Sequence, residues 1–246
     1  MSKQIYLVVA ILLFLAGLAV FLYPHIQGAA LERESSQAVE DFQSALATPP
    51  PMLPPANKPD LTVTPTPMPH AELFDAMAAY NEDIYRERQV SFSDPWACAT
   101  PALDLSPFGL DSGVIGVISI PALELEMPLY LGATQDNLAA GAAVLGQTSL
   151  PIGGVNTNSV IAGHRGWDGA DYFRYVDTLT AGDEVRITNL WETLTYAVAE
   201  SRIIYPDESE AVHIQEGRDL VTLLTCHPYA SGGKQRLLVF CERVLE

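Results

Sequence analysis

The stretch Asp219-Leu-Val-Thr-Leu-Leu-Thr-Cys226 is an apolar, β-branched run that ends in a thiol. It is followed by residues 227–233, His-Pro-Tyr-Ala-Ser-Gly-Gly, whose proline and glycines are typical of a turn, and then by a second apolar run at residues 236–240. This pattern predicts a β-hairpin in which the start of the second strand lies beside the end of the first. We therefore expect Cys226 and Arg236 to face each other on neighbouring strands.

Similar short runs, rich in β-branched or aromatic residues, occur in the chain before this hairpin and are separated by Gly, Pro, Asn and Asp. They lie at residues 114–120, 127–131, 159–162, 184–188 and 194–199. Between the predicted strands, residues 135–140 and 172–179 have helical character. Seven strands with such short helices indicate a mainly β fold, either a closed barrel or a sandwich.

Residues 5–23 form an uncharged, mostly apolar run near the N-terminus. At about 1.5 Å per residue, a helix of this length nearly spans the roughly 30 Å hydrocarbon core of a membrane. Lys3 before the run favours an N-terminus on the inner side. The alternative is a cleaved signal peptide, with Gly28 and Ala30 as the small residues of its cleavage site, but signal sequences usually have apolar runs of about 7–15 residues. We expect residues 1–30 to be a transmembrane anchor.

Residues 31–70 are expected to be a juxtamembrane and proline-rich spacer. Half of the chain's 18 prolines fall within residues 48–70, a density that disfavours helix and central strand and favours an extended polyproline II conformation. The folded domain, residues 71–246, is expected to start with a helix. Its apolar residues follow steps of four, three and four, the spacing of one helical face: Leu73, Met77, Tyr80 and Ile84.

The formal net charge of the chain is −17, from 30 acidic and 13 basic residues. A chain this acidic repels the phosphate backbone of nucleic acids, so we expect no nucleic acid among its partners. The acidic excess fits simple solubility, and it would also suit a cationic partner such as a lysine-bearing chain.

The three cysteines, Cys98, Cys226 and Cys241, form no C-x-x-C pair and no sequence cluster with histidine, which argues against a metal site. Their odd number leaves at least one thiol unpaired. Cys241 lies within the last predicted strand, where a small apolar side chain suits the core, and Cys98 has no assigned role. Cys226, at the end of a strand, is the candidate nucleophile.

A guanidinium beside a thiol has a chemical use, because it favours the thiolate and donates hydrogen bonds to an oxygen that gains negative charge during acyl transfer. Such a site also needs a proton carrier. His164 is the candidate, since it follows the predicted strand 159–162 and so lies at a strand-to-loop corner, although taken alone it fits a structural histidine better. His227 adjoins Cys226 but would point to the opposite face of the strand.

The motif Thr222-Leu-Leu-Thr-Cys226 resembles the T-L-x-T-C signature of the sortase family, and Arg236 lies ten residues later, where that family keeps its arginine. Three further segments are similar to the pilin-assembling members, called class C: residues 118–123, 163–166 (Gly-His-Arg-Gly) and 188–196. The resemblance extends over about residues 71–246. It implies the closed sortase β-barrel with short peripheral helices, preceded by the transmembrane helix and the spacer.

The same resemblance implies a chemistry. The thiolate of Cys226 would attack a backbone carbonyl in an L-P-x-T-G-like sorting signal of a surface or pilin protein and form a thioester. His164 would protonate the departing amine and deprotonate the incoming one, while Arg236 would stabilise the oxyanion. In class C the incoming amine is a lysine side chain of another pilin subunit, and no cofactor is needed. The enzyme would be a single-pass protein of the cell membrane with an extracellular catalytic domain.

Asp94-Pro95-Trp96 resembles the Asp-Pro-aromatic lid of class C sortases. The resemblance implies that Asp94 pairs with Arg236 and that Trp96 covers Cys226. An ordinary Asp-Pro turn with a tryptophan packed on the surface would explain the same residues.

Three other functions fit the same residues. The chain would also fit a sortase that attaches proteins to the cell wall, or a related Cys-His hydrolase that transfers its acyl group to water. A more distant possibility is a non-catalytic surface barrel that only binds, although an unpaired thiol on an exported domain argues against it. A sorting-signal peptide and an amine would distinguish these functions, by transfer, hydrolysis or no reaction.

Overall fold

The computed structural model describes residues 3–47, 68–87, 89 and 103–245. Most of the proline-rich segment, the expected lid residues Asp94, Pro95 and Trp96, and the third thiol, Cys98, lie outside these ranges.

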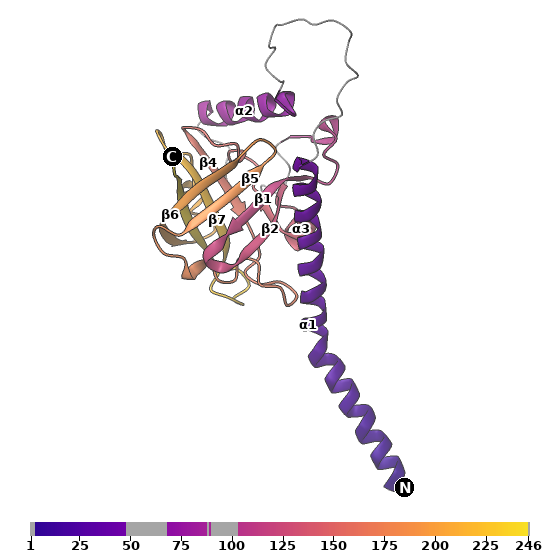
Figure 1. Cartoon of the computed structure of the whole chain (residues 1–246). Coiled ribbons are helices and arrows are strands. Elements are labelled where there is room, and N and C mark those ends of the chain that lie inside the picture. The colour runs from indigo at the N-terminus through magenta and orange to yellow at the C-terminus, as the bar shows by residue number, and fades with distance from the viewer. Residues whose placement is uncertain (1–2, 48–67, 88, 90–102, 246) are drawn as a thin grey trace, which may run out of the picture.

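The described domain is built around eight strands that form a closed barrel (Figure 1). The strands are β1 (Val114–Ile120), β2 (Leu125–Leu131), β3 (Ala142–Val144), β4 (Thr157–Ala162), β5 (Glu184–Asn189), β6 (Thr193–Ile204), β7 (Asp219–His227) and β8 (Gln235–Arg243). Their order around the barrel is β1-β2-β3-β4-β7-β8-β6-β5. The predicted closed β-barrel is thereby confirmed, and each predicted strand lies within an observed one.

Two differences concern strands. Strand β3 was not predicted, because its three residues, Ala-Ala-Val, are too few to show a period of two. Strand β6 continues past the predicted residue 199 to Ile204, over a segment of mostly exposed residues that pairs along β8. Pairing with a neighbouring strand, rather than local hydrophobicity, sets the length of β6.

Helical segments surround the barrel. The short helix α3 (Gln135–Ala140) has the predicted bounds, whereas the predicted helix at 172–179 is only one 3₁₀ turn, η4 (Val176–Thr178). In the described part of the chain, three other 3₁₀ turns lie at η2 (Ser106–Phe108), η3 (Pro121–Leu123) and η5 (Ser209–Val212).

The expected helix at the start of the folded domain is α2 (Ala71–Arg86), which lies across one end of the barrel in Figure 1. It buries Leu73 and Met77 at spacing four against the core. Its buried Asn81 side chain exchanges hydrogen bonds with the backbone of Leu150, donating at 3.1 Å and accepting at 2.6 Å. This helix therefore seals one end of the barrel.

Strands β7 and β8 are buried on both faces, which explains their unbroken apolar sequence. Alternate residues, among them Leu223 and Val239, point into the core that all eight strands enclose. The residues between them, such as Leu224 and Leu238, pack in a second cluster outside the barrel, with Leu138 of α3 and Val212 of η5. Each strand residue therefore belongs either to the inner face or to this covered outer face.

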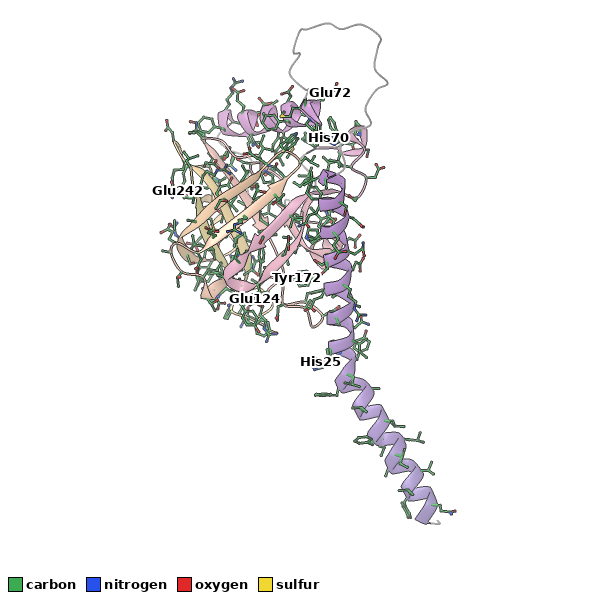
Figure 2. The ribbon with its side chains drawn as sticks, viewed as in Figure 1. His25, His70, Glu72, Glu124, Tyr172 and Glu242 are labelled. Carbon is green, nitrogen blue, oxygen red and sulfur yellow. The ribbon has the colours of Figure 1, made fainter. Side chains whose placement is uncertain are left out.

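The N-terminal helix α1 (Lys3–Ala47) is continuous across the expected boundary at residue 30. The described N-terminal part of α1 is exposed. Among the described residues, α1 is the one helix that is long and apolar enough to be a candidate membrane span. Further along, Val39 and Phe42 are buried against Val114 and Val117 of β1. Figures 1 and 2 show α1 lying along the barrel and then bending away from it near His25. Pro24 inside the helix accounts for this bend, since proline cannot donate the helical hydrogen bond.

Candidate active site

The β7–β8 hairpin places Cys226 directly opposite Arg236. Residues that pair directly across two antiparallel strands project to the same face. By alternation this is the outer face, which also carries Leu224 and Leu238. The predicted juxtaposition of the thiol and the guanidinium is therefore what the strand register produces.

Gly233, in the loop that joins these strands, has a φ of +75°, which favours glycine, and its lack of a side chain leaves room at the site. A Cβ at this position would lie 3.1 Å from Nη1 of Arg236 and 3.3 Å from Sγ of Cys226. Nη1 of Arg236 also donates hydrogen bonds to the carbonyl oxygens of Gly233 and Gln235, the latter at 3.1 Å. The loop thus holds the guanidinium beside the sulfur atom.

His164 reaches the same end of the barrel because β4 runs parallel to β7. Ala162 pairs with Leu224, and the ladder continues beyond the strand: the Gly163 amide donates to the Leu224 carbonyl at 3.1 Å, and the Thr225 hydroxyl donates to the Gly163 carbonyl at 2.8 Å. His164, two residues after Ala162, therefore lies opposite Cys226 in the register of these two parallel strands. Alternation places His164, like Ala162, on the outer face.

The ring of His164 stacks on Trp167, with ring centroids 4.3 Å apart and an interplanar angle of 11°. Tyr172 approaches it edge-on at 6.5 Å. Burial between these rings lowers the pKa of His164 below its usual 6.5, because burial disfavours the charged imidazolium, and the nearby Asp168 carboxylate partly offsets this by raising the pKa. His164 in this state is therefore mainly neutral at pH 7.

Arg165, which the sequence analysis did not single out, is a buried cation at the junction of the two strand ends. Its Nη1 atom donates to Nδ1 of His227 at 2.8 Å and lies 3.4 Å from the Cys226 carbonyl oxygen. Its Nη2 atom forms an ion pair with Asp177 in η4. Because arginine has only donors, Nδ1 of His227 must be the acceptor. The available signal was its place in Gly-His-Arg-Gly, directly after His164.

The two described thiols have different surroundings. Cys226 is half-buried, at the end of β7. Cys241, expected to be a core residue, is fully buried with Leu237 and Val239, and burial raises the pKa of its thiol to about 12. At physiological pH, Cys241 stays a thiol that solvent does not reach, so Cys226 is the described cysteine that is able to meet a substrate.

Within the described ranges, no group of three or more His, Cys, Asp and Glu side chains is arranged to hold a metal ion. The chemistry that the described residues do support is that of a thiol, an imidazole and a guanidinium on one face of the barrel. The expected contacts of Asp94 with Arg236 and of Trp96 with Cys226 involve residues outside the described part of the chain.

Comparison with known proteins gives a consistent result. The family sequence model of the sortase domain matches residues 118–244 of the chain. Sortase A of Bacillus anthracis is 28% identical over 229 residues, which are 92% of this chain and 89% of that protein. Sortase D of Bacillus subtilis is 26% identical over 131 residues, which are 52% of this chain and 63% of that protein.

Solved structures of class C sortases have the same fold. Sortase C1 of group B Streptococcus pilus island 1 superposes with a TM-score of 0.70 at 28% identity, covering 86% of this chain and 93% of that one. Sortase C of Clostridium perfringens superposes with a TM-score of 0.65, also at 28% identity, over 85% and 99% of the two chains. With its closed barrel and the matching domain model, the chain belongs to the sortase family of cysteine transpeptidases.

Proposed function

We propose that this sortase cleaves an L-P-x-T-G-like sorting signal in a surface or pilin protein and transfers the acyl group to a lysine of a pilin subunit, which polymerises pili. The observation that carries the proposal is the pairing of Cys226 with Arg236, level with His164 on the outer face of the barrel. The class C structural neighbours, one of them named after a pilus island, support the pilin substrate.

In the proposed first step, the Cys226 thiolate attacks the carbonyl carbon of the sorting signal. The oxygen gains negative charge beside Arg236, whose guanidinium is held by the carbonyl oxygens of Gly233 and Gln235. The C–N bond then breaks, and the departing amine takes a proton from the His164 imidazolium. The product is a thioester on Cys226 and a neutral imidazole.

In the second step, the lysine amine attacks the thioester and gives a proton to the neutral His164. The C–S bond breaks, the Cys226 thiolate returns, and an isopeptide bond joins the two proteins. Burial of His164 suits both steps, because a lowered pKa makes the imidazolium a stronger acid while the neutral ring remains the major form.

We also propose the division of the chain into an anchor (1–30), a spacer (31–70) and a catalytic domain (71–246), with the catalytic domain outside the cell. The exposed apolar part of α1 supports the anchor. Helix α1 continues through the first boundary as far as Ala47, so the anchor and part of the spacer lie on one continuous helix. Asp94, Pro95 and Trp96 are proposed as a lid on their resemblance to class C alone.

Incubation of the enzyme with a sorting-signal peptide and two competing amines tests the acceptor. One amine is a folded pilin domain with its lysines, and the other is a short peptide with a free N-terminal glycine. We expect mass spectrometry to find an isopeptide bond to a lysine. A product joined only to the glycine amine would show a wall-anchoring type of sortase instead, and exclusive hydrolysis would show a Cys-His hydrolase.

Arg236→Ala should lower kcat by about 10²–10³-fold, the usual loss for one oxyanion donor. Arg236→Lys should recover little of it, because an ammonium does not reproduce the planar fork of donors. Arg186 of β5 is the matched control, since its exposed guanidinium pairs with Glu184 and Arg186→Ala should leave kcat near that of the unmodified enzyme. If Arg236→Ala keeps more than about a tenth of kcat, the residue is not the oxyanion donor.

Asp168→Asn should lower the pKa of His164 further, because the substitution removes the carboxylate that raises it. The imidazolium should then form only at a lower pH, so the pH profile of kcat/KM should shift towards acid. Asp171→Asn is the control, since Asp171 lies in the same loop and pairs with Arg174. NMR titration of the His164 ring measures the shift directly. An unchanged or raised pKa would contradict the assigned environment.

A further inference from the structure

Helix α1 touches the active-site end of the barrel through backbone atoms at the point where it leaves the barrel. The contact joins Gly28 of the helix to Gly169 of the histidine loop, by which we mean residues 163–173. A Cβ on Gly28 would lie 2.6 Å from the carbonyl carbon and 2.7 Å from the carbonyl oxygen of Gly169. These separations are too short for real atoms, so any side chain at residue 28 must displace the helix or the loop.

The same contact also excludes a side chain on Gly169. A Cβ on Gly169 would overlap the carbonyl oxygen of Pro24 and lie 3.3 Å from the Cα atom of Gly28. Gly169 also has a φ of +90°, a conformation that side-chain-bearing residues rarely adopt. By contrast, Gly17, on the same helix, has no atom within 4 Å of its Cβ position. The close approach is thus local to the bend of α1 and not a general property of its glycines.

The histidine loop connects this contact to the proposed proton carrier. Gly169 lies inside a tight turn closed by two hydrogen bonds between Trp167 and Ala170, at 2.8 and 3.0 Å. The ring of Trp167 stacks on His164. One side of the turn therefore rests on α1 while its tryptophan forms a wall of the histidine site.

The two ends of the loop are bonded to each other and to α3, and the helix is bonded to the barrel further along. The Phe173 amide donates to the His164 carbonyl at 2.9 Å, and the Tyr172 hydroxyl donates to the Ala139 carbonyl at 2.6 Å. Figure 2 shows Tyr172 beside α1. Further along α1, the Gln43 side chain donates to Glu126 of β2 at 2.9 Å. A steric change at residue 28 therefore acts on a loop that has little room to move elsewhere.

We propose that Gly28 and Gly169 are positioning residues, whose backbone contact lets the membrane-proximal part of α1 hold the histidine loop, and through Trp167 the ring of His164, in its working orientation. On this inference α1 is part of the catalytic apparatus as well as an anchor. The inference rests on the proposed function in one respect, namely that His164 carries the proton.

The test uses the full chain in detergent micelles and compares Gly28→Ala and Gly28→Leu with Gly17→Ala and Gly17→Leu. A displacement of about 1 Å in a reacting group costs about 100-fold in rate. We therefore expect Gly28→Leu to lower kcat of transfer by about 10–100-fold, Gly28→Ala to lower it less, and KM for the sorting peptide to change little. Both Gly17 variants should match the unmodified chain.

A second measurement separates positioning from a loss of folding. The described groups that face His164 are the Trp167 and Tyr172 rings and the Asp168 carboxylate. Displacement of the loop exposes the imidazole to water, so NMR titration of Gly28→Ala should show its pKa raised towards 6.5 while the melting temperature of the barrel is unchanged. If Gly28→Leu unfolds the barrel, the kcat and the His164 pKa of Gly28→Ala alone decide whether the positioning inference holds.

The variant His164→Ala, in the otherwise unmodified chain, distinguishes a failure of the positioning inference from a failure of the role proposed for His164. If His164→Ala is inactive while Gly28→Ala and Gly28→Leu change neither kcat nor the His164 pKa, the positioning inference is wrong and the proposed function stands. If His164→Ala transfers at the normal rate, the assigned role of His164 is wrong, and the positioning inference falls with it.

Discussion

The parallel pairing of β4 with β7 is the constraint on which the site depends. The β7–β8 hairpin is local in sequence and brings Cys226 and Arg236 together without help from the rest of the fold. His164 is remote in sequence and comes level with Cys226 only because both strands end at the same edge of the barrel. Parallel neighbours require a long connection, and here the connection supplies β5 and β6, which close the barrel on its other side.

The inner and outer faces of the barrel sheet differ in which side chains a substrate is able to reach. Inward residues of β7 and β8 fill a core without room for chemistry, and Cys241 shows the result, since burial raises its pKa to about 12. Outward residues in the middle of these strands are buried under α3 and η5, whereas Cys226, at the end of β7, is only half-buried. Cys226 differs from Cys241 by facing outward at a strand end, so strand register rather than residue type separates a reactive position from an inert one.

Much of the fold could be predicted because the deciding signals are local. β1 and α3 have the predicted bounds, and the hairpin follows from proline and glycine between two apolar runs. Strand β3 was not predicted because three residues are too few to show the alternation of buried and exposed side chains along a strand. The extension of β6 was not predicted because its exposed residues are held in the sheet by pairing with β8.

In the site, Cys226, Arg236 and His164 could be singled out because each lies at a strand end and in a motif that resembles those of the sortase family. Trp167 and Arg165 were not singled out, because their contacts depend on the path of a loop. The stack of Trp167 on His164 and the bond from Arg165 to His227 exist only once that loop has packed against β7 and α1. The docking of α1 likewise depends on two glycines far apart in the sequence, which no periodicity connects.

The central claim is that Cys226 forms a covalent thioester with the sorting signal. The most direct measurement is mass spectrometry of the intact protein after rapid acid quenching with a sorting-signal peptide and no amine acceptor, followed by peptide mapping. The account predicts an added acyl fragment on Cys226 that hydroxylamine removes, and the same adduct in a Cys241→Ala protein. Cleavage of the peptide by a Cys226→Ala protein, or an adduct located on Cys241, would contradict it.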